Sequence, residues 1–110
     1  MEYFEFIETP VFSKQRLELL DDDSYQQFQA YLLKGHEDGD TISKTGGCKK
    51  IRWGLEGKGK RGGVRVIYYC LAEQGKIYLL LIYSKNRKDD LSEQEKKVLN
   101  QFSQMLNRPQ

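Results

Sequence analysis

The chain has 110 residues, a length typical of a single domain that buries a modest core without disulfides or metals. Its two cysteines, Cys48 and Cys70, form no CxxC pattern and are too few for a disulfide scaffold, so we expect a reduced, cytoplasmic protein. The longest apolar run, residues 77–83, has the length of a strand, and residues 1–8 are acidic, which disfavours membrane and secreted proteins. We expect residues 1–110 to form one domain with no membrane partner.

The net charge of +2 hides a strong separation of sign along the chain. Residues 1–40 carry 3 basic and 10 acidic side chains, residues 41–88 carry 12 and 2, and residues 89–110 carry 3 and 4. The middle segment therefore has a net charge of +10, which attracts phosphate-rich polymers through Coulomb forces and counterion release. A solvated basic face with no ligand is the alternative interpretation.

The first forty residues predict a strand followed by two helices. Residues 3–7 are aromatic and of strand length, and the Thr-Pro pair at residues 9–10 is a start signal for a helix that runs to about Leu20. The acidic turn at residues 21–23 can cap a second helix that ends at Gly35. The two helices are expected to form a hairpin. The second helix has an apolar stripe made of Tyr25, Phe28 and Leu32.

The second half of the chain predicts an antiparallel sheet. After a loop at residues 36–47, apolar residues alternate with Lys50 and Arg52, which indicates a half-exposed strand. Strands at residues 64–71 and 77–83, joined by a short turn, complete a three-strand meander. These two strands are apolar on both sides, so the sheet should be covered on both faces.

A C-terminal helix can supply the second cover. Ser92 and Glu95 have the spacing of a capping box, which marks the start of this helix. Its apolar stripe consists of Val98, Leu99, Phe102, Met105 and Leu106. The predicted fold class is α+β, with a small antiparallel sheet, an N-terminal helical hairpin and a C-terminal helix.

A basic, glycine-rich segment at residues 57–63 matches the sequence pattern of a phosphate-binding loop but not its expected structural context. It satisfies the GxGxxG pattern, but a strand follows it, whereas a nucleotide cradle needs a helix at that point. We therefore expect no nucleotide cofactor. The glycines instead allow a flexible hairpin loop to approach a polyanion, with charge supplied by Lys58, Lys60 and Arg61.

Basic residues and a phenol are expected to meet at one end of the sheet. If the last hairpin pairs Leu71 with Ile77, antiparallel register places Arg65 roughly opposite Tyr83 and sets Lys85 on the same face. If the first hairpin closes between residues 55 and 64, Lys50 and Arg52 join them, although a slip of one residue reverses this. Such a cluster suits a phosphodiester transition state, where negative charge builds up. Ordinary strand-end side chains are the alternative interpretation of Arg65 and Lys85.

Other catalytic chemistries find little support. His36 is the sole histidine and lies at a predicted helix end, far in sequence from the basic segment, so we do not expect it to be catalytic. With two isolated cysteines there is no ligand set for zinc, and the acidic clusters at residues 21–23 and 89–90 are better interpreted as caps and turns than as metal sites. We expect neither cysteine to have a partnering histidine nearby, which disfavours acyl transfer.

Three segments together resemble the RelE/HigB toxins of bacterial toxin–antitoxin systems. They are GGCKKIR at residues 46–52, GKRGGVRVIYY at residues 59–69 and YSKN at residues 83–86. The glycine-rich part is similar to the HigB-2 branch, and the similarity extends over nearly the whole chain. It implies a RelE-like fold and a metal-independent endoribonuclease, an mRNA interferase. Such an enzyme cleaves mRNA in the ribosomal A site by attack of the ribose 2′-hydroxyl on the neighbouring phosphate.

The resemblance also implies roles for individual residues. Lys50, Arg52 and Arg65 would hold the scissile phosphate. Lys85 would assist at the leaving oxygen, and Tyr83 would stack on a base or transfer a proton. The partners implied are mRNA, the ribosome with its 16S rRNA, and a helix-turn-helix antitoxin through which alone the protein reaches operator DNA; no cofactor is implied. Contacts to RNA or ribosome are expected from Lys49, Lys58, Lys60, Arg61, Arg87 and Lys88.

One departure from RelE concerns proton transfer. RelE has an arginine directly after the lysine of the last strand and a catalytic tyrosine shortly beyond it, whereas here Asn86 follows Lys85 and no tyrosine follows Tyr83. The general base is therefore unassigned. Two other functions remain open: a non-catalytic RNA- or ribosome-binding module, and a protein-interaction domain whose basic face docks an acidic partner.

Overall fold

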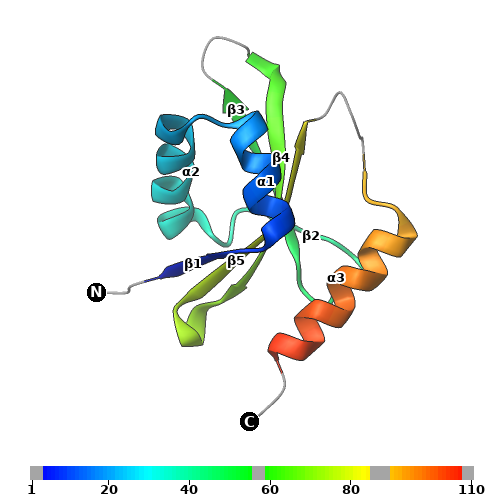
Figure 1. Ribbon diagram of the computed structural model, residues 1–110. Coiled ribbons are helices and arrows are strands. Elements are labelled where there is room, and N and C mark those ends of the chain that lie inside the picture. The colour runs from blue at the N-terminus through cyan, green and yellow to red at the C-terminus, as the bar shows by residue number, and fades with distance from the viewer. Residues whose placement is uncertain (1–3, 56–58, 85–89, 108–110) are drawn as a thin grey trace.

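The computed structural model describes residues 4–55, 59–84 and 90–107, with the backbone alone for residues 55 and 59–62. A five-stranded sheet of order β1-β5-β4-β3-β2 forms the centre of an α+β fold, which confirms the predicted fold class (Figure 1). The strands are β1 (Glu5–Glu8), β2 (Asp40–Thr41), β3 (Lys49–Leu55), β4 (Gly59–Leu71) and β5 (Lys76–Ser84). The helices are α1 (Pro10–Leu19), α2 (Asp22–Gly35) and α3 (Glu93–Leu106), with a 3-10 turn at Ala72–Gln74.

Helices α1 and α2 form the predicted hairpin and cover one face of the sheet. The Thr9 hydroxyl accepts a hydrogen bond from the Phe12 amide at 3.0 Å, and the Asp21 carboxylate accepts one from the Ser24 amide at 2.7 Å. These side chains satisfy amide groups that a helix start leaves without partners. The buried side of both helices packs on strand residues to form the larger core, which includes Phe12, Phe28, Leu32, Val66, Tyr68 and Leu79.

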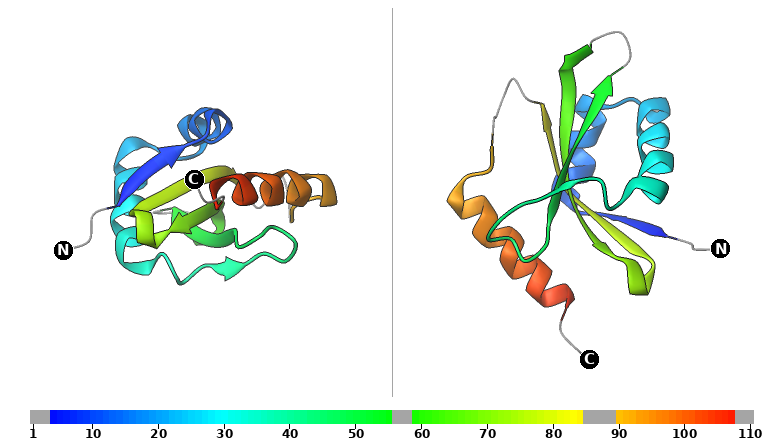
Figure 2. Two further views of the ribbon diagram at one scale, coloured as in Figure 1. Left: turned by 90° about the horizontal axis from the view of Figure 1, so that it is seen from below. Right: turned by 180° about the vertical axis from the view of Figure 1, so that it is seen from behind.

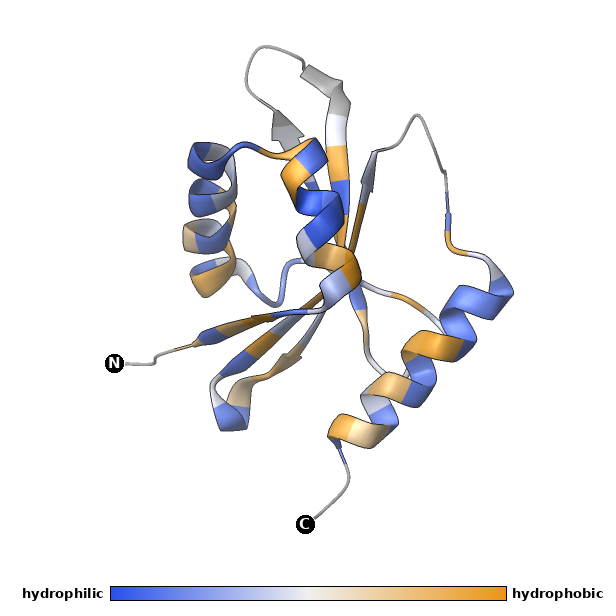
Figure 3. Ribbon diagram, in the orientation of Figure 1, coloured by the Kyte–Doolittle hydropathy of each residue, from blue (hydrophilic) through white to orange (hydrophobic). Residues whose placement is uncertain are grey.

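Helix α3 covers the opposite face and stands apart from α1 and α2 in both views of Figure 2. Leu99 is buried, and the ring of Phe102 meets Tyr78 edge-on at 6.0 Å. Val98 and Met105 were predicted to face the core but are 53% and 61% exposed. The apolar stripe is wider than the side of α3 that contacts the sheet, so residues at its edges remain exposed. Figure 3 shows the apolar bands of α3 interleaved with hydrophilic ones. Among the described residues, no helix is long and apolar enough to cross a bilayer.

The capping box at the start of α3 is present as predicted. The Ser92 hydroxyl accepts from the Glu95 amide at 3.1 Å, and the Glu95 carboxylate accepts from the Ser92 amide at 2.8 Å. We predict that Ser92→Ala lowers the free energy of unfolding by about 0.5–2 kcal/mol, because one helix-start amide loses its acceptor. Urea denaturation checks this value, with Ser43→Ala in the exposed loop as control. Equal stability of the two variants would contradict it.

The sheet contains the predicted antiparallel meander and one parallel pair. Strands β3, β4 and β5 pair antiparallel in chain order, whereas β1 pairs parallel to β5 at the edge. A prediction from local sequence alone could not place β1, because its partner follows about 70 residues later. The predicted loop at residues 36–47 contains the short strand β2, which pairs with the start of β3.

The glycine-rich segment differs from its prediction as a flexible loop. Strand β4 already begins at Gly59, and Leu55 pairs with Gly59 rather than with Val64, across a register shift that follows Trp53. The reason is close backbone approach: a side chain at Gly63 would place its Cβ 2.8 Å from the Trp53 carbonyl oxygen. Glycine therefore serves here in strand pairing, a use that the composition of the segment does not distinguish from a loop.

Candidate functional site

Three residues on neighbouring strands form a transverse row on the α3 side of the sheet. Arg65 on β4 pairs with Arg52 on β3 and with Tyr83 on β5, which confirms the predicted pairing of Arg65 with Tyr83. The turn assumed for it was wrong by one residue, because Leu71 pairs with Lys76, and a register shift after Ile67 compensates. Lys50 lies two residues before Arg52 and therefore on the same face. The predicted convergence of Lys50 and Arg52 with this row is confirmed, although the register differs by two residues from the one assumed. We call these four residues the basic cluster.

Arg65 is the buried centre of the basic cluster. Only 6% of this residue is exposed, and among the described residues no carboxylate lies within ion-pair distance of its guanidinium. The exposed Arg52 sits directly opposite, and like charges at opposite strand positions destabilise a sheet. A buried cation is normally paired. The cluster is therefore poorly explained as a stabilising feature and well suited to hold an anion.

Tyr83 contributes a phenol that keeps its proton at neutral pH. Burial is the largest cause that raises its pKa, and the negative charges of Asp90 and Glu95 raise it further. The positive charge of Arg65 lowers the pKa in part without reversing the shift. Because the protonated form is favoured, Tyr83 can donate a hydrogen bond or a proton but is a poor acceptor of one.

Asp90 lies beside the basic cluster, which the sequence analysis did not predict. Its Oδ1 is 4.0 Å from Lys50 Nζ and also accepts a hydrogen bond from the Leu91 amide at 2.8 Å. The latter contact agrees with the predicted role of Asp90 in a turn. No sequence signal predicts the first contact, because Asp90 precedes α3 and belongs to no periodic segment.

Several predicted site residues lie elsewhere or outside the described residues. Lys49 is on the opposite face of β3, where its ammonium contacts the Thr41 hydroxyl at 3.3 Å. The side chains of Lys60 and Arg61 are not described, although their backbone belongs to β4. Four further residues lie outside the described residues: Lys58, Lys85, Arg87 and Lys88.

One prediction about the cysteines was wrong. His36 does lie beside a cysteine, because its Nδ1 is 3.6 Å from Cys70 Sγ. The pair joins residues that are 34 positions apart, so sequence distance concealed it. Burial is the main cause that raises the pKa of the Cys70 thiol, and the Glu37 carboxylate adds to it. The thiol therefore stays protonated at neutral pH, and the pair does not form an activated nucleophile.

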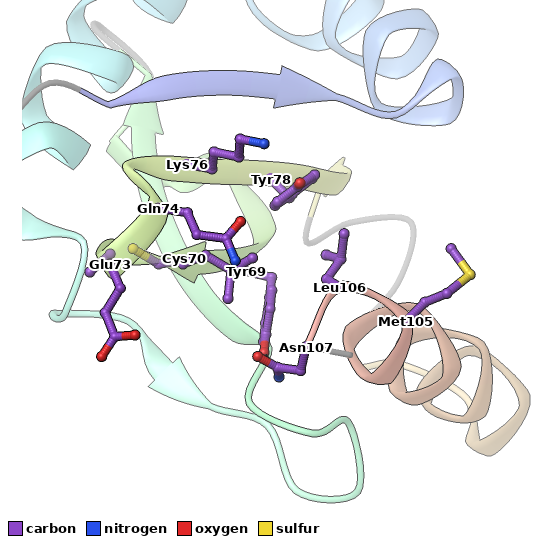
Figure 4. A pocket seen from close by; sticks show the side chains of 11 residues that line it. Tyr69, Cys70, Glu73, Gln74, Lys76, Tyr78, Met105, Leu106 and Asn107 are labelled. Carbon is purple, nitrogen blue, oxygen red and sulfur yellow. The ribbon is translucent and has the colours of Figure 1, made fainter. Parts of the chain in front are cut away.

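A cavity of about 940 Å³ lies away from the basic cluster (Figure 4). It opens between the β4–β5 turn and the C-terminal end of α3, and its walls include Tyr69, Tyr78 and Leu106. The Asn107 amide donates a hydrogen bond to the Tyr69 hydroxyl at its rim. No residue of the basic cluster lines this cavity.

The fold is similar to that of known toxins. A mutant of the E. coli toxin RelE in the free state shares the fold with a TM-score of 0.55 and 16% identity, over 81% of this chain and 90% of that chain. The intact E. coli RelBE toxin–antitoxin complex matches with a TM-score of 0.51 and 17% identity, over 74% of this chain and 95% of that chain. At this level of identity the two matches establish a RelE-like fold.

Family membership comes from the sequence. The family described as the RelE toxin of the RelE / RelB toxin-antitoxin system matches residues 9–109, so this chain belongs to the RelE toxin family. The protein is thus a toxin of the toxin–antitoxin type, and the predicted resemblance to RelE toxins is confirmed. Its assignment to the HigB-2 branch stays a prediction.

Proposed function

We propose that the protein is an mRNA interferase, an endoribonuclease that needs no metal and cleaves mRNA in the ribosomal A site. The observation that carries this proposal is the buried guanidinium of Arg65, flanked across the sheet by Arg52 and Tyr83. Membership of the RelE toxin family supports it. RNA contains its own nucleophile, the 2′-hydroxyl, so the protein has to supply charge stabilisation and proton transfer rather than an activated water.

The proposed chemistry places the scissile phosphate over the basic cluster. When the 2′-oxygen attacks phosphorus, negative charge builds on the non-bridging oxygens, and fixed donors stabilise that charge more than they stabilise the ground state. Arg65 is held rigidly by burial, and its planar guanidinium can donate two hydrogen bonds to one phosphate. Arg52 and Lys50 add positive charge on the same face. Tyr83 and Lys85 are assigned to the leaving oxygen.

The partners follow from the same proposal. We place the protein in the cytoplasm with translating ribosomes, where mRNA and 16S rRNA are contacted by basic residues around the cluster. The similar RelBE structure is a toxin–antitoxin complex, which supports a cognate antitoxin as protein partner here. We propose that this antitoxin has a helix-turn-helix fold and links the protein to operator DNA.

Brief induction of the protein in growing cells, followed by primer extension on abundant mRNAs, tests the proposal. The expected result is growth arrest together with new 5′ ends inside codons of translated messages. Prior addition of an inhibitor of translation initiation should remove these ends, since ribosomes then leave the messages. Growth arrest with intact messages would identify a non-catalytic ribosome-binding module instead, and the proposal would be rejected.

A further inference from the structure

The basic cluster lacks an obvious acceptor for the proton of the attacking 2′-hydroxyl. Arg52 and Arg65 stay protonated at any physiological pH, so neither can serve. A lysine ammonium such as that of Lys50 has three donors and no acceptor. Burial and neighbouring carboxylates raise the pKa of Tyr83, which suits a proton donor. A proton acceptor must therefore come from outside these four residues.

We propose that Asp90 is the general base of the reaction, an inference that rests on the proposed ribonuclease function. Its Oδ1 lies 4.0 Å from Lys50 Nζ, so the carboxylate stands at the border of the basic cluster. Oδ1 is engaged by the Leu91 amide, whereas Oδ2 accepts no hydrogen bond within the described part of the chain. With 66% of its side chain exposed, Asp90 is accessible to a bound ribose.

The other described carboxylates at the start of α3 have hydrogen-bond or ion-pair partners outside the basic cluster. Glu95 accepts the Ser92 amide hydrogen in the capping box. Glu93 pairs with Lys44 at 3.7 Å and with Lys96 at 3.8 Å, both outside the basic cluster. Asp90 thus combines a position beside the cluster with a carboxylate oxygen that is open to solvent. Asp90 and Glu95 both raise the pKa of Tyr83, so both charges reach the cluster, but the Glu95 carboxylate is held in the capping box.

The proposed step balances atoms and charge. Asp90 takes the proton of the 2′-hydroxyl while the 2′-oxygen forms its bond to phosphorus. The bond between phosphorus and the 5′-oxygen breaks, and the leaving oxygen takes a proton from Tyr83 or from solvent. The products are a 2′,3′-cyclic phosphate and a 5′-hydroxyl. Lys50 and Arg65 face the same region from β3 and β4.

The test compares Asp90→Asn with Glu93→Gln in single-turnover cleavage of mRNA on purified ribosomes. Asparagine keeps the shape of aspartate and its acceptor for the Leu91 amide but cannot take a proton. We expect Asp90→Asn to slow cleavage by about 10²- to 10⁴-fold, the range of general base catalysis. Glu93→Gln removes a negative charge from the same helix start and should cleave at the wild-type rate.

The pH dependence separates a base from a residue that merely positions Lys50. The wild-type rate should fall at acid pH, because a protonated carboxyl accepts no proton, and Asp90→Asn should lose this fall. A slow variant that retains the acid fall would overturn the assignment, and so would a variant as fast as wild type or faster. If the wild-type protein itself leaves mRNA intact, the proposed function fails together with the inference. If wild type and Asp90→Asn cleave equally, only the inference fails.

Discussion

Replacement of Arg65 by alanine should reduce cleavage of translated mRNA by about 10²- to 10³-fold, the usual cost of one fixed donor to a developing oxyanion. Growth inhibition on expression should disappear as a result. The expectation follows from the burial of Arg65 and from its central place between Arg52 and Tyr83. Single-turnover cleavage on purified ribosomes measures the rate, and colony formation after induction measures toxicity.

Two companion variants keep this experiment interpretable. Arg65→Lys retains the charge and loses the planar fork, so it should recover only part of the rate. Lys14→Ala removes an exposed positive charge from α1, on the other side of the sheet, and should remain fully toxic. Circular dichroism and urea denaturation show whether Arg65→Ala is folded. A folded Arg65→Ala protein with wild-type cleavage would remove Arg65 from the site.

Replacement of Phe28 by alanine should lower the free energy of unfolding by about 3–5 kcal/mol, a large share of the stability of a typical domain. Phe28 is fully buried on α2, and its ring meets Trp53 of β3 edge-on at 5.4 Å. The loss combines removed apolar contact with a cavity that the surrounding side chains fill only in part. Trp53 neighbours Arg52 in the same strand, so this packing also supports the strand that carries part of the basic cluster.

Urea denaturation followed by tryptophan fluorescence measures the Phe28→Ala effect, since Trp53 is the sole tryptophan and lies against the substituted side chain. The matched control is Gln27→Ala, an exposed neighbour on the same helix that should change stability by about 0.5 kcal/mol or less. A Phe28→Ala protein as stable as this control would show that α2 contributes little to the core.

Features with a strong local signal could be predicted from the sequence. Both helix starts after Thr9 and Asp21 carry side-chain caps, and the capping box at Ser92 marks α3. The pairing of Arg65 with Tyr83 was predictable for a different reason. The two strands are antiparallel neighbours in the chain, which limits the possible registers. The turn itself pairs Leu71 with Lys76 rather than with Ile77, and a register shift between Ile67 and Tyr68 restores the predicted pairing.

Features that depend on contacts between distant segments could not be predicted. The strand at β1 was predicted, but its parallel pairing with β5 was not. This pairing and the contact between His36 and Cys70 both join residues separated by a large part of the chain. The position of Asp90 next to Lys50 depends on the path between β5 and α3, for which sequence periodicity carries no information. Glycine-rich composition likewise does not distinguish a loop from a strand that requires close backbone approach, as at Gly63.

The central claim is that the basic cluster promotes attack of a ribose 2′-hydroxyl on mRNA. The most direct measurement uses a synthetic message on purified ribosomes, first mapped for its cleavage position and then remade with one 2′-deoxynucleotide immediately 5′ of the scissile phosphate. The account predicts cleavage of the all-ribose message to a 2′,3′-cyclic phosphate and no cleavage at the deoxy position. Undiminished cleavage at the deoxy position would contradict it.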